Sequence, residues 1–176
     1  MNMRPAFGAV AATMTLLSFA QASGFRLNTT PSIPEGIYLA DPKPPGRGDL
    51  VLVCPPDTAF FRGARANGYL SRGRCPGGYV PLMKPIAAVE GDTVEITPVG
   101  IRVNGAALAN TRAYGTDAHG NVLPHPKAGR HVVQPGEMWL LSSYDRRSID
   151  SRYFGPLPIA DVETVVRPVL VQGRGH

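Results

Sequence analysis

The sequence predicts a mainly β, antiparallel fold with short helices or loops, preceded by an N-terminal signal or anchor helix. Glycine and proline are unusually abundant, with 20 and 18 of the 176 residues, and both residue types disfavour long helices. Short runs of β-branched and aromatic residues alternate with turn residues after position 25. No long 3.6-residue hydrophobic period follows the N-terminal segment. These three observations argue against a helix bundle.

The first 22 residues are predicted to be a cleaved signal peptide or a retained membrane anchor. Arg4 precedes an uncharged stretch at residues 5–25. A bilayer span needs about 20 apolar residues, and the Thr, Ser and Gln residues of this stretch make it a marginal permanent anchor. The Ala-Gln-Ala sequence at residues 20–22 resembles a cleavage site. Both alternatives place residues 23–176 outside the cytoplasm, so we expect one periplasmic domain at the outer face of the cytoplasmic membrane.

Six segments are predicted to contain β-strands. They are residues 36–40, 49–54, 79–89, 92–105, 136–143 and 161–171. Alternation of apolar and polar residues around Pro98-Val99-Gly100 predicts a hairpin, and Asn104-Gly105 predicts a further turn. Residues 112–130 are rich in glycine and proline and are predicted to form a long exposed loop.

The net charge of +5 comes from arginines that are scattered along the chain. There is no basic run and no interleaving of basic and aromatic residues, so nucleic acid is not an expected partner. Attraction to an anionic membrane surface explains the charge equally well. Only three lysines are present, and they are Lys43, Lys84 and Lys127.

Cys54 and Cys75 are the two cysteines and flank a loop-rich stretch. In an oxidising compartment such a pair suits a disulfide, which would stabilise the fold by about 3 kcal/mol. A reduced pair is the alternative and would leave the stretch loosely held. No metal site or cofactor is expected, because the cysteines lack Cys-x-x-Cys spacing and the histidines lie far away in sequence.

Ser32 is the first candidate for chemistry. It lies between Pro31 and Pro34, which restrict the backbone to extended conformations. A serine held in this way presents a fixed hydroxyl. The alternative is an ordinary polar residue of a linker.

Lys84 is the second candidate and lies within an apolar stretch at residues 82–89. Burial lowers the pKa of a lysine and allows its amine to act as a general base near neutral pH. The alternative is an edge-strand lysine that points to solvent, and Pro85 is consistent with an edge or a bulge.

The third candidate segment, residues 142–158, is dense in charged and hydroxyl residues. It either braces a site through a hydrogen-bonded network or forms a loop of ion pairs.

Four blocks, taken in order, resemble the type I signal peptidases, which are serine proteases with a Ser/Lys dyad. They are Thr30–Pro34, Gly48–Val51, Lys84–Asp92 and Ser148–Gly155. The chain looks most like the TraF-type conjugal-transfer branch, and the resemblance covers about residues 25–160. One departure is Ile33-Pro34-Glu35-Gly36 after the serine, where the family often has methionine and a hydroxyl residue. This departure favours the conjugative branch.

The resemblance implies that Ser32 is the nucleophile and Lys84 the general base. Thr30 would contribute its hydroxyl to the oxyanion hole, and Ser148 would orient the Lys84 amine. In the conjugative branch the residue at Asp150 is regarded as catalytic, whereas ordinary signal peptidases use it structurally.

Arg152 is the structural partner that the resemblance implies for Asp150. The resemblance also implies that the enzyme processes a pilin precursor through an acyl-enzyme, with a linear or circular product and a preference for small side chains. The alternative function is a non-catalytic periplasmic component of a conjugative pilus or secretion apparatus. We expect a monomer.

Overall fold

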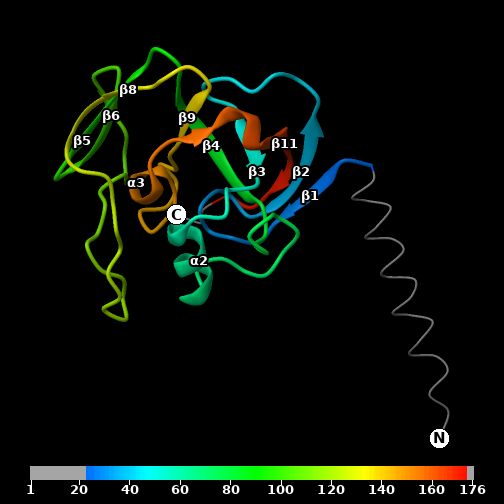
Figure 1. The fold of residues 1–176 in the computed structure, drawn as a ribbon. Coiled ribbons are helices and arrows are strands. Elements are labelled where there is room, and N and C mark those ends of the chain that lie inside the picture. Colours follow the sequence, from blue (N-terminus) through cyan, green and yellow to red (C-terminus); the bar gives the residue numbers. More distant parts are fainter. Residues whose placement is uncertain (1–22, 174–176) are drawn as a thin grey trace, which may run out of the picture.

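The computed structural model describes residues 23–173 and confirms a mainly β, antiparallel fold (Figure 1). The strands are β1 (Phe25–Asn28), β2 (Gly36–Asp41), β3 (Leu50–Val53), β4 (Leu82–Val89), β5 (Thr93–Thr97), β6 (Gly100–Val103), β7 (Ala106–Ala107), β8 (Gly129–Val132), β9 (Glu137–Leu140), β10 (Leu157–Pro158) and β11 (Val162–Val171). The helices are α2 (Ala59–Ala66), α3 (Ser151–Phe154) and the 3₁₀ helix η1 (Ile159–Asp161).

The strands form two sheets. The larger sheet has seven strands in the order β1-β2-β11-β3-β4-β9-β10, and the smaller has four in the order β7-β6-β5-β8. In Figure 1 the smaller sheet lies at the end of the molecule away from β1. The predicted signal peptide or anchor at residues 1–22 lies outside the described residues. Within residues 23–173, no helix is long and apolar enough to cross a bilayer.

Each of the six predicted segments contains a strand, and both predicted turns are present. Thr97 pairs with Gly100 across the β5–β6 hairpin. Asn104 and Gly105 both have positive φ, 50° and 81°, which a two-residue type I′ turn requires. Between positions 112 and 128 the chain forms neither helix nor named strand, as predicted, but the last two residues of the predicted loop, Gly129 and Arg130, belong to β8.

The stretch between Cys54 and Cys75, which the sequence describes as loop-rich, also contains the helix α2. Phe61 and Ala64 are buried on one face of this helix. The Phe61 ring packs at 5.0 Å from that of Phe154, measured between centroids. Two helical turns give too short a window to show a 3.6-residue period, and tertiary packing supplies most of the stability of such a helix.

A small core cluster lies beneath the two candidate residues. It consists of Ile33, Tyr38, Leu52, Met83 and Val166. Ile33 directly follows Ser32, and Met83 directly precedes Lys84. Burial of these two apolar neighbours in one cluster therefore fixes the serine loop against the lysine strand.

Strand β11 lies between β2 and β3 and joins the N-terminal hairpin to the rest of the sheet. Gly36 begins β2 with φ of +146° at this junction. A Cβ atom at Gly36 would lie 2.2 Å from the carbonyl oxygen of Leu170 in β11. Only glycine therefore allows the two backbones to approach this closely.

Candidate active site

The loop between β1 and β2 carries Ser32, and the buried side chain of Asn28 organises it. The Asn28 amide donates to the carbonyls of Thr30 at 2.9 Å, Ile33 at 3.3 Å and Pro34 at 3.1 Å. Its Oδ1 accepts from the backbone N–H of Thr30 at 3.2 Å. One side chain thus provides hydrogen-bond partners for several backbone groups of the loop, and these bonds fix the position of Ser32.

The hydroxyl of Ser32 is 3.3 Å from that of Thr30. Thr30 already donates its proton to Asn28 Oδ1 at 2.8 Å, so Ser32 is the donor between the two hydroxyls. The family resemblance implies that the Thr30 hydroxyl donates a hydrogen bond to the oxyanion. To do so, this hydroxyl must give up its bond to Asn28 and donate to the substrate oxygen instead. Ser32 is only 7% exposed.

Lys84 lies on β4 in the middle of the larger sheet, between β3 and β9. It pairs with Val51 and is 5% exposed. The alternative of a solvent-facing lysine on an edge strand is therefore wrong. Pro85 is tolerated here because the β4–β9 register shifts nearby, between Ile86 and Ala88.

Burial lowers the pKa of Lys84 from 10.5 to about 8. The Asp150 carboxylate opposes this shift, the Arg152 guanidinium reinforces it, and the Asp145 carboxylate opposes it more weakly. Asp150 and Arg152 act on the Lys84 pKa in opposite directions, and desolvation, the largest cause, determines the direction of the shift. An appreciable fraction of the amine is neutral near pH 8.

Ser148 is buried, and its hydroxyl has no hydrogen-bond partner within residues 23–173. Its backbone N–H donates to the Asp145 carbonyl at 3.1 Å. A buried hydroxyl without a partner is costly, so this oxygen is available to an amine that moves toward it. The predicted role of Ser148 in orienting Lys84 stays a prediction.

Asp150 and Arg152 form a buried bidentate ion pair. Arg152 Nε donates to Asp150 Oδ1 at 2.7 Å, and a terminal nitrogen donates to Oδ2 at 2.8 Å. The guanidinium also donates to the carbonyls of Asn110, Arg146 and Ser142. Asp150 caps the N-terminus of α3. The structure places this carboxylate within a satisfied network and not in the wall of the cavity described next.

Ser32 and Lys84 line the same cavity of about 500 Å³. Its walls come from the β1–β2 loop, residues 69–71, the start of β4 and residues 145–149. Most of the wall is apolar, including Leu52, Leu70 and Met83. Both side chains therefore face a common space, and within the described chain no hydrogen bond joins Ser32 to Lys84.

Tyr69 forms part of the cavity wall, and a distant loop holds it in place. Its hydroxyl donates to Asp117, which also accepts from the backbone and side chain of Asn121. Burial, followed by this hydrogen bond, raises the pKa of Tyr69. The loop at residues 112–128 thus contributes to the site through the contact between Asp117 and Tyr69. The glycine- and proline-rich sequence of the loop did not indicate this contact.

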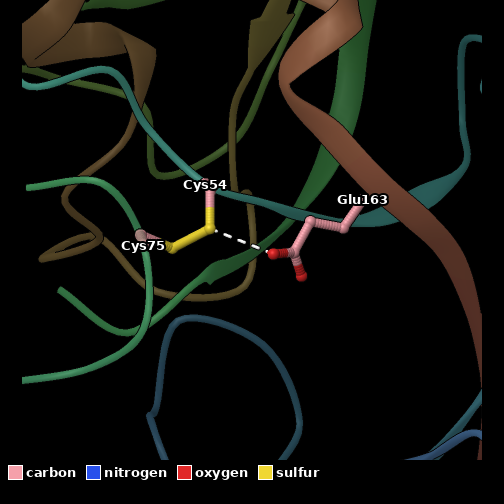
Figure 2. Close-up of side chains that lie close together, drawn as sticks. All are labelled: Cys54, Cys75 and Glu163. Carbon is pink, nitrogen blue, oxygen red and sulfur yellow. Dashed lines mark hydrogen bonds between the residues drawn. A yellow bond between two sulfur atoms is a disulfide. The ribbon is translucent and has the colours of Figure 1, made fainter. Parts of the chain in front are cut away.

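A disulfide joins Cys54 and Cys75 and closes the excursion that carries α2 and Tyr69. Figure 2 shows the Glu163 carboxylate pointing at Cys54, with 3.0 Å between Oε1 and Sγ. The oxidised sulfur carries no proton, so this contact is not a hydrogen bond, and disulfide sulfurs are not thiolate ligands for a metal. Arg74 instead binds the carboxylate through both terminal nitrogens.

No histidine lines the cavity among residues 23–173. His119 and His125 are exposed in the 112–128 loop. His131 lies on β8, with its ring 5.9 Å from that of Trp139. Within the described region, the geometry thus offers Ser32 a lysine and no imidazole.

Comparisons with known proteins show which family the chain is similar to. The sequence profile of signal peptidase, peptidase S26, matches residues 2–171. The chain is 38% identical over 159 residues to the plasmid transfer protein TraF of Escherichia coli, with 90% of each chain covered. It is 43% identical over 164 residues to the conjugal transfer protein TraF of Agrobacterium tumefaciens strain 15955, with 92% of this chain and 91% of the relative covered.

A signal peptidase I crystal structure from Enterococcus faecalis matches with 24% identity and a TM-score of 0.40. The match covers 70% of this chain and 97% of that one.

Proposed function

The chain belongs to the signal peptidase family, peptidase S26, and on this basis we propose that it is a serine endopeptidase with a Ser32/Lys84 dyad. The observation that carries the proposal is the buried Lys84, whose pKa falls to about 8 beside the cavity that it shares with Ser32. A lysine with such a pKa can accept a hydroxyl proton near neutral pH.

The proposed reaction begins when Ser32 rotates away from Thr30 and donates its proton to the neutral Lys84 amine. Ser32 Oγ attacks the substrate carbonyl carbon, and the backbone N–H of Ser32 and the Thr30 hydroxyl stabilise the oxyanion. The C–N bond breaks as Lys84 returns the proton to the leaving amine. Water or another amine then attacks the acyl-enzyme and releases the second product.

We propose a pilin precursor as the substrate, because the relatives at 38% and 43% identity are named plasmid and conjugal transfer proteins. We propose that the substrate binds in this cavity as an extended peptide with small side chains before the cut, since apolar side chains such as Leu70 and Met83 line the cavity together with Ser32. Attack by water gives a linear pilin, and attack by the N-terminal amine of the pilin gives a circular one.

The proposed location is the periplasm, at the outer face of the cytoplasmic membrane, with the protein acting as a monomer. The apolar residues at 5–25 and the net charge of +5 support this location. The chain would be soluble after removal of residues 1–22, or anchored by them.

Ser32→Ala separates the peptidase from a non-catalytic assembly component. We expect cells that carry this variant to accumulate unprocessed pilin precursor, because the variant lacks the hydroxyl that would form the acyl-enzyme. The measurement is the mass of the pilin from variant and wild-type cells, with Ser143→Ala as the exposed-serine control. An unchanged mature mass in the Ser32→Ala cells would favour the assembly component.

The pH dependence of cleavage reports on Lys84. The neutral amine is the active form, so we expect kcat/KM to rise with pH to a midpoint near 8 and to fall about tenfold per pH unit well below it. A peptide cleavage assay between pH 5 and pH 10 measures the profile. A midpoint near 6.5 that disappears when His131 is replaced would instead indicate a histidine base.

A further inference from the structure

We propose that Ser142 is a positioning residue, whose hydroxyl holds the backbone of the nucleophile Ser32 and couples it to the Asp150–Arg152 pair. This inference rests on the proposed peptidase function. Ser142 is the first residue of the candidate segment at residues 142–158, but it lies 110 residues from Ser32, and the sequence assigned it no role of its own.

The hydroxyl of Ser142 donates to the carbonyl oxygen of Ser32. Both residues are buried, with Ser142 fully inaccessible. The same oxygen accepts from the backbone N–H of Tyr144 at 3.1 Å. A donated hydrogen bond to the Ser32 carbonyl fixes the peptide plane that follows the nucleophile, and therefore the backbone rotation that aims Ser32 Oγ.

The Asp150–Arg152 ion pair binds both backbone polar groups of Ser142. Its N–H donates to Asp150 Oδ2 at 3.0 Å, and its carbonyl accepts from the Arg152 guanidinium at 2.8 Å. Asp150 Oδ2 also accepts from that guanidinium at 2.8 Å. These three bonds close a ring, so Ser142 cannot move unless the pair moves with it.

This arrangement gives Asp150 two separate effects on the reaction, neither of which requires contact with substrate. Through Ser142, it fixes the position of Ser32. Through its charge, it raises the pKa of Lys84. The first effect changes the rate of attack at every pH, and the second changes the pH at which the amine becomes neutral. Kinetics can therefore separate them.

The test is acylation of Ser32 by a p-nitrophenyl ester of an N-blocked peptide that ends in alanine. The Ser32 oxygen displaces p-nitrophenolate, so the burst of absorbance measures acylation and the protein mass confirms the ester. For Ser142→Ala we expect the acylation rate constant at saturating ester to fall about 10- to 100-fold, since a buried carbonyl loses its donor. We expect the half-saturating ester concentration and the pH midpoint near 8 to stay unchanged.

Two variants serve as controls. Ser142→Thr retains the hydroxyl and should recover most of the rate. Ser143→Ala removes the neighbouring exposed hydroxyl and should acylate like the wild type, because the Ser143 carbonyl, which accepts from the Asn110 amide, is kept in this variant. If Ser142→Ala does not fold, Ser142→Gly takes its place, because it also lacks the hydroxyl.

Asp150→Asn is the second variant to be tested in the acylation assay. We expect this variant to lower the acylation rate and also to move the pH midpoint to lower values, because the carboxylate no longer raises the Lys84 pKa while Arg152 still lowers it. Adding Ser142→Ala to Asp150→Asn should cost little further rate, because Asp150 positions Ser32 through the same Ser142 hydroxyl.

Acylation by Ser142→Ala or Ser142→Gly at the wild-type rate would overturn the inference. So would fully additive losses in the double variant. Failure of the wild type itself to form the acyl-enzyme would instead overturn the proposed peptidase function, so the two failures are distinguishable.

Discussion

Replacing Lys84 by arginine lowers kcat/KM for precursor cleavage by about 10²- to 10⁴-fold, the contribution expected of a general base. Arginine keeps the positive charge but cannot lose its proton in a protein, so Ser32 has no acceptor. Cleavage of a pilin precursor by the purified variant, followed by mass spectrometry, measures the loss. Normal processing by the arginine variant would exclude Lys84 as the base.

Lys84→Met is the matched control, because arginine in a buried position can also impair folding. The folded-state pKa of about 8 lies below the ordinary 10.5, so the unfolded chain holds this proton more tightly. The wild-type free energy of unfolding should therefore rise as pH increases from about 8 to about 10.5. The methionine variant lacks this rise and should be more stable at pH 7 by about 3 kcal/mol.

The methionine variant should thus be folded, more stable and inactive. Urea unfolding at several pH values provides the measurement. A methionine variant that is less stable than the wild type at pH 7 would show that the amine is not held in a desolvated state.

Arg152→Met should destabilise the fold by about 3–5 kcal/mol, because it leaves a buried carboxylate without its cation. Asp150 and Arg152 are both inaccessible to solvent, and Arg152 also satisfies three backbone carbonyls. Thermal or urea unfolding measures the loss.

The double variant Asp150→Asn with Arg152→Met controls for this effect. Asparagine retains the capping oxygen for α3 and carries no charge, so the double variant should be closer to wild-type stability than Arg152→Met alone. Equal losses in the two variants would mean that the unpaired charge is not the cause.

Sequence patterns predicted the sheet better than the helices. The predicted strands coincide with β2, β3, β4, β5, β6, β9 and β11, which are rich in β-branched, aromatic and other large apolar residues. Strands β7 and β10 have two residues each, too few to show alternation, and β8 begins within the segment that was predicted to be a loop. Helix α2 is stabilised by aromatic contacts with residues far away in sequence, such as Phe154. A local sequence pattern cannot predict such contacts.

The two central candidates of the site, Ser32 and Lys84, could be identified because each belongs to a block that resembles a known family. The residues that hold them in place could not. Asn28, Ser142 and Tyr69 act through contacts that only the tertiary structure brings together. Similarly, the apolar neighbours of Lys84 suggested burial, but only the position of β4 inside the sheet showed it.

The strand order also affects when the site can form during synthesis. Strand β11, at Val162–Val171, supplies the sheet hydrogen bonds between the hairpin that bears Ser32 and the strands that bear Lys84. A ribosome releases these residues after those of every other strand of the sheet, so a growing chain lacks that junction while its earlier strands are already complete. The candidate site should therefore stay incomplete until β11 has left the ribosome.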